Sequence, residues 1–162
     1  MLLVRLCKTA FVAAIAFFFT LVAYGNLSDY DSNWQFTQHV LAMDTIFPDS
    51  TLRWRAITDP SIQEWAYWSI IAAEIVVAVV LWIGALRLLA NLSGPNFASA
   101  RTTAVVGLTL GFLLYSVGFV SVGGEWFAMW QSETWNGQQK AFEFLTMISA
   151  ALIVVLLPEP SN

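Results

Sequence analysis

The sequence predicts an all-α membrane protein, a bundle of four transmembrane helices with a structured extracytoplasmic cap. Three observations predict this fold class: four long apolar runs, a hydrophobic fraction of 58%, and a charged fraction of only 11%. A soluble domain has roughly a quarter of its residues charged, and about 20 apolar residues are enough to cross the hydrocarbon core of a bilayer. The 162 residues leave room for a single membrane domain, residues 1–162.

The first predicted span covers residues 9–24, and Arg5 and Lys8 precede it. A charged start followed by an apolar stretch is also typical of a signal peptide. We favour an uncleaved anchor, because the run is long for a signal and three further spans follow. Since Lys and Arg collect on the cytoplasmic side of membranes, we expect the N-terminus to be cytoplasmic.

Residues 25–64 are expected to form the first segment of the cap. This connection is too long for a turn and too rich in aromatic residues for a disordered linker. Within it, Asn33 is expected to cap a short helix over residues 34–44 that has one apolar side and one polar side with His39. Such a helix is typical of the membrane interface, or of a segment that covers the end of a bundle.

The second predicted span covers residues 65–90, after a helix-start signal in which Asp59 caps the helix and Pro60 takes its first position. Glu74 lies inside this span, roughly 13 Å along the helix axis from its start. A carboxylate in hydrocarbon costs several kcal/mol unless it has a partner, a proton or water. Glu74 is therefore a protonatable group for proton or cation movement, an anchor for a partner chain, or a structural residue that ties the spans together.

The third predicted span covers residues 102–122. Thr103, Gly107 and Gly111 lie four residues apart in it, and small residues at this spacing allow another helix to approach closely. A second cap segment, residues 123–140, follows and is rich in tryptophan. Anchoring at the membrane interface is the simpler account of these tryptophans, and a ligand pocket is the alternative.

The fourth predicted span covers residues 141–157, and Pro158-Glu159-Pro160 is expected to end it. The charges favour a topology with both termini cytoplasmic, because most of the acids fall in the two cap segments. The cations expected on the cytoplasmic side are Arg5, Lys8, Arg87 and Arg101. The net charge of −4 and the scattered Lys and Arg residues argue against a nucleic-acid partner.

Several motifs in the cap segments resemble those of a known family. They lie at residues 38–45, 54–57, 123–132 and 134–139, and Glu74 in the second span accompanies them. Together they resemble the DUF2165 family of bacterial predicted small integral membrane proteins, and the resemblance covers nearly the whole chain. It implies a bacterial inner-membrane protein with four spans, and it implies no activity and no catalytic residue.

Five residues form the candidate polar site: Glu74, His39, Arg53, Arg55 and Glu125. Because Glu74 lies in the outer half of its span, a cap residue is the partner that we expect to find near it. The three cap residues with the chemistry to contact a carboxylate in this way are His39, Arg53 and Arg55.

The ligand set for a metal is incomplete in this sequence. His39 and Met43 share a helix face, which suits a soft metal, but metal sites generally take three or four protein ligands. We therefore expect no metal and no cofactor. Arg53 and Arg55 are expected to form ion pairs with acids of the cap, with lipid phosphate as the alternative partner. Those acids are Asp44, Asp49, Glu125 and Glu133.

The sequence has no nucleophile motif and no phosphate-binding glycine loop, so we expect no enzyme activity. We expect an accessory or scaffold subunit of a larger inner-membrane complex, respiratory or transport, that contacts lipid and other membrane subunits or further copies of itself. The alternative is a small oligomeric channel or proton-coupled transporter that uses Glu74.

Overall fold

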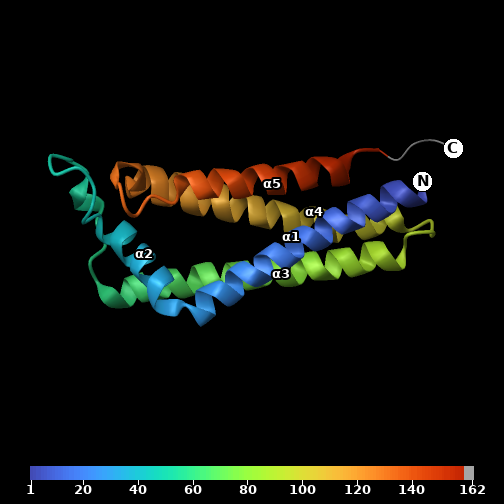
Figure 1. Cartoon of the computed structure of the whole chain (residues 1–162), viewed down its shortest axis with the longest axis horizontal. Coiled ribbons are helices and arrows are strands. Elements are labelled where there is room, and N and C mark those ends of the chain that lie inside the picture. Colours follow the sequence, from blue (N-terminus) through green and yellow to red (C-terminus); the bar gives the residue numbers. More distant parts are fainter. Residues whose placement is uncertain (159–162) are drawn as a thin grey trace. The chain divides into compact units, whose positions relative to one another are not determined.

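The computed structural model describes residues 1–158, and within that range every regular element is a helix (Figure 1). The long elements are α1 (Leu2–Ser28), α3 (Pro60–Ala90), α4 (Phe97–Leu113), its π-helical continuation η2 (Leu114–Trp126), and α5 (Gln138–Leu156). The short elements are α2 (Tyr30–Ala42) and the 3-10 helices η1 (Arg53–Arg55) and η3 (Met129–Gln131).

Four helical stretches within residues 1–158 are long and apolar enough to cross a membrane, with α4 and η2 counted as one stretch of 30 residues. The predicted fold class, an all-α membrane protein with four transmembrane helices, is therefore confirmed. The spans lie inside longer helices than predicted, because α1 continues to Ser28 and α3 begins at Pro60. Helix α5 ends at Leu156, and Glu159 and Pro160 of the predicted stop signal lie outside the described residues.

The second cap segment begins later than predicted, because η2 continues through Gly123 and Gly124 to Trp126. A glycine in a helix costs only about 1 kcal/mol relative to alanine, so packing can override it. At Gly124 packing requires it: a Cβ there would overlap the side chain of Gln138 at the start of α5. Gly124 therefore marks a close contact with α5, and neither glycine ends the helix.

The two predicted helix starts had different outcomes. Helix α2 begins at Tyr30, four residues earlier than predicted, and Asn33 lies inside it with its Nδ2 donating to the Asp29 carbonyl at 3.1 Å. The prediction that Asn33 caps this helix is therefore wrong. The Asp59 carboxylate accepts hydrogen bonds from the backbone N–H groups at the start of α3, at 2.8 and 3.3 Å, so the predicted cap at Asp59 is confirmed.

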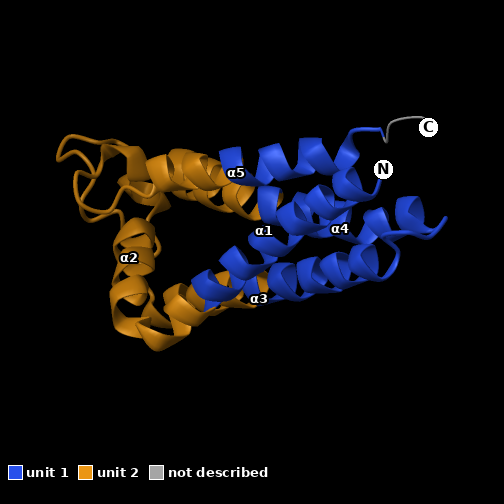
Figure 2. Ribbon diagram, turned by 45° about the vertical axis from the view of Figure 1, so that its right-hand side comes forward, with its two compact units in different colours: residues 1–23, 74–112, 146–162 blue, residues 24–73, 113–145 orange. Residues whose placement is uncertain are grey.

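The chain divides into two compact units (Figure 2). Unit 1 comprises residues 1–23, residues 74–112, and the chain from residue 146 onward. Unit 2 comprises residues 24–73 and 113–145. The divisions fall within α1, α3, α4 and α5, so each of these helices contributes residues to both units.

Small residues in unit 1 allow its helices to approach closely. A Cβ on Gly84 of α3 would lie 2.8 Å from the Ala104 backbone, and a Cβ on Gly107 of α4 would lie 2.8 Å from Leu81. Gly111 makes a comparably tight contact with the part of α1 in this unit. The close helix approach predicted at Gly107 and Gly111 is therefore confirmed.

Two cations in unit 1 bind the carbonyl groups at the end of α5. Lys8 is only 2% exposed, and its Nζ donates to the Val155 carbonyl at 3.3 Å and also to the Leu157 carbonyl. Arg101 Nη1 donates to the same two carbonyls at 3.3 and 3.5 Å. The last carbonyls of a helix have no partner within it and carry partial negative charge, so these cations cap α5.

The other two cations of unit 1 also have defined contacts. Arg5 Nη1 donates to the carbonyls of Leu92 and Gly94, at 3.0 and 2.8 Å, and so holds the connection between α3 and α4. Arg87 Nη1 donates to Thr103 Oγ1 at 2.7 Å. Thr103 therefore serves as a hydrogen-bond acceptor in addition to its predicted role as a small contact residue.

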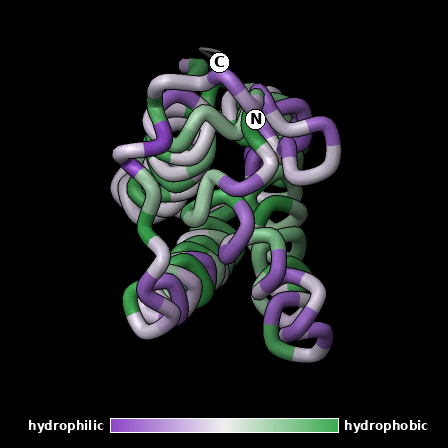
Figure 3. Tube along the Cα trace, turned by 90° about the vertical axis from the view of Figure 1, so that its left-hand side faces the viewer, coloured by the Kyte–Doolittle hydropathy of each residue, from purple (hydrophilic) through white to green (hydrophobic). Residues whose placement is uncertain are grey.

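Unit 2 has an apolar core between α2 and the segment that follows η2. Its buried members are Val40, Leu41, Met43, Ile46, Phe127, Ala128 and Met129. Met43 and Ala128 are fully buried and have a φ of 51°, a left-handed conformation that non-glycine residues rarely adopt. Such conformations persist where the surrounding packing holds them. The connecting segments carry hydrophilic as well as hydrophobic residues (Figure 3).

Candidate functional site

The five candidate polar residues are divided between the two units. Glu74 belongs to unit 1 and is only 1% exposed, whereas the other four belong to unit 2. The contacts described below for His39, Arg53 and Arg55 are all with residues of unit 2. A partnership between one of them and Glu74 stays a prediction.

His39 is held in place by residues of unit 2 on two sides. Its Nδ1 donates to Asp44 Oδ2 at 2.7 Å, and its ring stacks on Trp135 with a centroid separation of 4.6 Å. The left-handed turn at Met43 ends α2 and brings Asp44 back to His39. Met43, the predicted co-ligand for a metal, is instead buried in the core of unit 2. Within residues 1–158 no group of three or more His, Cys, Asp or Glu side chains is placed to hold a metal ion.

Arg53 fixes the connection that follows α2. Its guanidinium donates to three backbone carbonyls at 3.1 to 3.3 Å, those of Met43, Ile46 and Phe47. The prediction that Arg53 forms an ion pair with an acid of the cap is therefore wrong. A carbonyl-rich turn needs hydrogen-bond donors more than it needs a neutralising charge, and the five N–H groups of a guanidinium supply them.

Arg55 forms a surface patch with two tryptophans, Trp54 and Trp126, which we call the tryptophan–arginine patch. The guanidinium carbon lies 5.4 Å from the Trp54 ring centroid and 4.7 Å from that of Trp126, and Nη1 donates to the Trp126 carbonyl at 3.2 Å. Trp54 is 73% exposed and Trp126 is 48% exposed. Arg55 makes these contacts instead of the predicted ion pair to Glu125. The Glu125 side chain is exposed beside Trp126.

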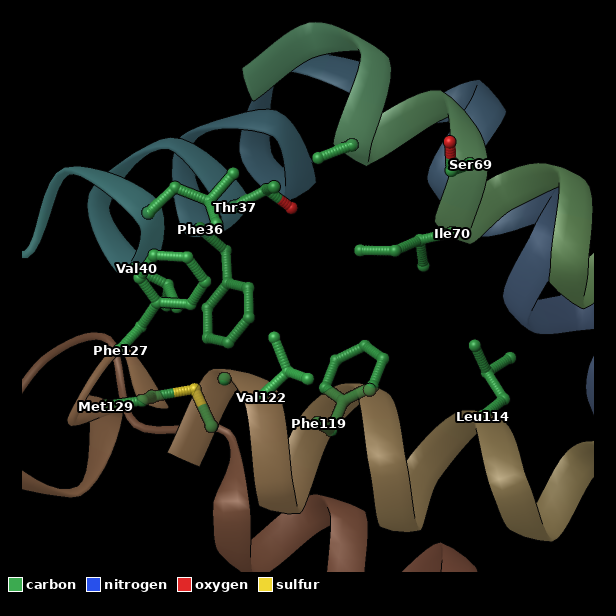
Figure 4. A pocket seen from close by; sticks show the side chains of 14 residues that line it. Phe36, Thr37, Val40, Ser69, Ile70, Leu114, Phe119, Val122, Phe127 and Met129 are labelled. Carbon is green, nitrogen blue, oxygen red and sulfur yellow. The ribbon is translucent and has the colours of Figure 1, made fainter. Parts of the chain in front are cut away.

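Unit 2 also contains an apolar pocket that the sequence did not indicate (Figure 4). Its volume is about 290 Å³, and its walls come from α2, α3, η2 and the segment that follows η2. The lining residues are Phe36, Thr37, Val40, Leu41, Ala66, Ser69, Ile70, Leu114, Gly118, Phe119, Val122, Gly123, Phe127 and Met129. None of them is charged, and only Thr37 and Ser69 have polar side chains.

One wall of the pocket is formed by the π-helix η2. Leu114, Gly118 and Val122 recur along the side of η2 that faces the pocket (Figure 4). Ser121 Oγ donates to the carbonyl of Ser116, five residues earlier, at 2.9 Å. π-Helical segments are rare, usually a single turn, and frequent at functional sites, whereas η2 has 13 residues. Gly118 has no side chain, so the π-helix η2 leaves space for the pocket along this wall.

A smaller cavity of about 70 Å³ adjoins the apolar pocket. The two share four lining residues: Phe36, Thr37, Ile70 and Phe119. The remaining walls of the smaller cavity are polar and come from Asn26, Asn33 and Tyr67. Unit 2 therefore contains an apolar pocket with a polar, uncharged extension at one side.

The comparison with protein families decides which family the chain belongs to. A family model described as "Predicted small integral membrane protein (DUF2165)" matches residues 4–158. The chain belongs to this family. No curated protein and no solved structure matches the chain. Membership in DUF2165 agrees with the four membrane-spanning helices and with the contact with lipid that they imply.

Within this DUF2165 protein, the tryptophan-rich segment does not supply the pocket in the way the sequence suggested. Phe127 and Met129 line the pocket, whereas Trp126 and Trp130 are 48% and 47% exposed. The sequence feature that could have indicated the pocket is Gly118, an isolated glycine inside an apolar helical pattern. A Cβ on Gly118 would meet only Leu114 of its own helix, at 3.9 Å.

Proposed function

We propose that this protein is a non-enzymatic accessory subunit of a larger membrane complex. The observation that carries the proposal is the tryptophan–arginine patch of unit 2, where Arg55 contacts two exposed tryptophans. Tryptophan and arginine are the residues most enriched at the energetic centres of protein interfaces. The contacts of the candidate polar residues support the non-enzymatic part of the proposal. His39, Arg53 and Arg55 hydrogen-bond to or stack on groups of the protein itself.

The test is co-purification of partner subunits after crosslinking in native membranes and mild detergent extraction. Wild-type protein should be recovered in a stoichiometric larger complex. Trp54→Ala should reduce that recovery roughly tenfold or more, because central interface residues commonly contribute about 2 kcal/mol or more. Trp65→Ala is the matched control, since Trp65 is 74% exposed and lies outside the patch. Recovery of a lone monomer, or equal losses in the two variants, would overturn the proposal.

A second function is favoured by Glu74, which is 1% exposed within a membrane-spanning helix. A buried carboxylate in a span is by default a functional hypothesis, here a small oligomeric channel or proton-coupled transporter. It predicts ion or proton flux in liposomes that Glu74→Gln abolishes while the helical content is retained. Equal flux in wild type and variant, or none in wild type across a panel of ions, would exclude this function.

We also propose a bacterial inner-membrane location with both termini cytoplasmic. The four cations Arg5, Lys8, Arg87 and Arg101 all belong to unit 1, which supports a cytoplasmic position for that part of the chain. Cys7 is exposed and is the only cysteine, so it reports the position of the N-terminus. A membrane-impermeant maleimide should label Cys7 only after the inner membrane is permeabilised. Labelling in intact spheroplasts would reverse the topology.

A further inference from the structure

The pocket of unit 2 is unfavourable for charged ligands. None of the residues that line the apolar pocket or the smaller cavity beside it carries a charged side chain. Transferring an unpaired charge into such surroundings costs far more than any contact there returns. A carboxylate, a phosphate or an ammonium group therefore has no compensating partner in this site.

The pocket is also too narrow for a bulky ligand. Its volume of about 290 Å³ is at the lower limit of typical ligand pockets, which run from about 300 to 1,000 Å³. One wall is formed by η2, with Phe119 and Val122, and the facing walls are formed by α2 and α3 (Figure 4). This shape and an almost entirely apolar lining suit one flexible hydrocarbon chain.

Thr37 supplies the one hydrogen-bonding group that faces both cavities. Its side chain is 93% buried, since only 7% is exposed, and it lines the apolar pocket and the smaller cavity. Within residues 1–158 its hydroxyl has no hydrogen-bond partner, although its oxygen points into the pocket in Figure 4. This oxygen is open to the cavity space, so a ligand hydroxyl or carbonyl that enters the pocket can hydrogen-bond to it.

We propose that unit 2 binds an uncharged amphiphile with a single hydrocarbon chain and a terminal hydroxyl or carbonyl group. The chain occupies the apolar pocket between α2 and η2. The polar end hydrogen-bonds to Thr37 Oγ1 at the boundary with the smaller cavity, where Asn26, Asn33 and Tyr67 form the remaining polar wall. The site lies within unit 2 and requires no partner subunit.

The experiment uses the full chain in phosphatidylcholine nanodiscs and photolabels it with 1-hexadecanol carrying a diazirine in mid-chain. Labelled peptides are mapped by mass spectrometry, and unlabelled 1-hexadecanol serves as competitor. We expect saturable labelling of pocket residues such as Phe119, Val122 and Phe127. Two further probes are the matched hexadecanoic acid at pH 9 and the matched alkane. The alkane should label these residues about three- to tenfold less, the factor that one hydrogen bond of about 1 kcal/mol provides. The carboxylate should label them less still, because its charge has no compensating partner in the pocket.

Two pairs of variants make the result specific to the pocket. Gly118→Leu places a side chain in the pocket without meeting a backbone atom and should abolish the saturable labelling. Gly25→Leu is its control, because a Cβ on Gly25 meets nothing within 4 Å and Gly25 does not line the pocket. Thr37→Val should reduce labelling by the alcohol about three- to tenfold and leave labelling by the alkane unchanged, whereas Thr37→Ser should retain both.

The opposite results overturn the proposal. Non-saturable labelling that is spread over exposed lipid-facing residues, such as Val76 and Val79, and that survives Gly118→Leu would mean ordinary contact with the bilayer. Equal labelling by the alcohol and the carboxylate would refute the selection against charge. Equal labelling of wild type and Thr37→Val by the alcohol would show that Thr37 does not hydrogen-bond to the ligand.

Discussion

Units 1 and 2 differ in charge as well as in packing. Unit 1 has four cationic side chains and, within residues 1–158, one carboxylate, that of Glu74. Unit 2 has three cations and nine carboxylates. In unit 1, Lys8 and Arg101 bind carbonyl groups at the end of α5, and small residues allow its helices to touch. Unit 2 has the left-handed residues, the π-helix and the pocket.

This difference indicates that the two units, which share the same long helices, differ in how closely their side chains pack. Close helix contacts and capped helix ends stabilise unit 1. A unit with strained backbone positions and an open apolar pocket keeps features that lower stability, and such features concentrate at functional sites. The four predictions that follow challenge this comparison, beginning with the largest expected effect.

Gly84→Leu should be the most damaging change in unit 1. Its side chain would overlap the backbone of Ala104, which cannot rotate away as a side chain would. Overpacking of this kind costs about 3 kcal/mol. Thermal unfolding in mild detergent, followed by circular dichroism, measures the loss. Gly25→Leu in unit 2 meets nothing within 4 Å and should cost little. Similar losses in both variants would show that unit 1 is not the more tightly packed unit.

Lys8→Met should destabilise unit 1 by about 2 kcal/mol. The substitution keeps the length of the side chain but removes the cation that donates to the carbonyls at the end of α5. Hydrogen bonds to charged groups contribute about 1.5–3 kcal/mol, and Arg101 keeps part of the cap in place. The chemical unfolding midpoint gives the change. Arg87→Met, at an exposed cation, is the control, and an equal effect there would argue against a special role for buried Lys8.

Arg53→Gln should loosen unit 2 locally, with an effect of about 1 kcal/mol. Glutamine supplies two donors in place of the five of arginine, so at least one of the carbonyls of Met43, Ile46 and Phe47 loses its partner. Amide hydrogen exchange over residues 43–52 should accelerate about fivefold, while exchange in α4 stays unchanged. Unchanged exchange over residues 43–52 would show that the backbone holds this connection without Arg53.

A structural feature could be predicted from the sequence where its signal comes from residues that are close together in the chain. The spans, the Asp59 cap and the close approach at Gly107 follow from spacing and composition, because each depends on residues near one another in the sequence. The buried position of Lys8 depends on α5, about 147 residues away, and no pattern near Lys8 indicates it. The excess of acids over cations in the cap segments likewise misled the prediction for Arg53. Its hydrogen-bond acceptors are backbone carbonyls.

The pocket was missed for a similar reason. Its walls come from three helices and a connecting segment, and each contributes apolar residues that a membrane helix would have in any case. The glycine at position 118 is the local feature that could have indicated the pocket, and the prediction did not draw on it. The π-helical geometry of η2 also has no sequence signature as clear as that of an amphipathic α-helix, so the prediction ended the third span at residue 122.

The smallest expected effect concerns the pH dependence of unit 2, through Tyr30. Partial burial, and then the nearby carboxylate of Glu64, raise the pKa of the Tyr30 phenol above its ordinary value of 10.0. The folded protein therefore disfavours the ionised phenol, and the stability that this group contributes is complete below pH 10 and is lost as the pH rises through the folded pKa.

Tyr30→Phe removes this titration, so its unfolding free energy should fall less than that of wild type between pH 9 and pH 11. Glu64→Gln, which removes the neighbouring charge and keeps the phenol, should give an intermediate slope. Chemical unfolding at the two pH values measures all three proteins. An identical alkaline loss in wild type and Tyr30→Phe would mean that other groups control the response, and the charge difference between the units would then have no consequence at Tyr30.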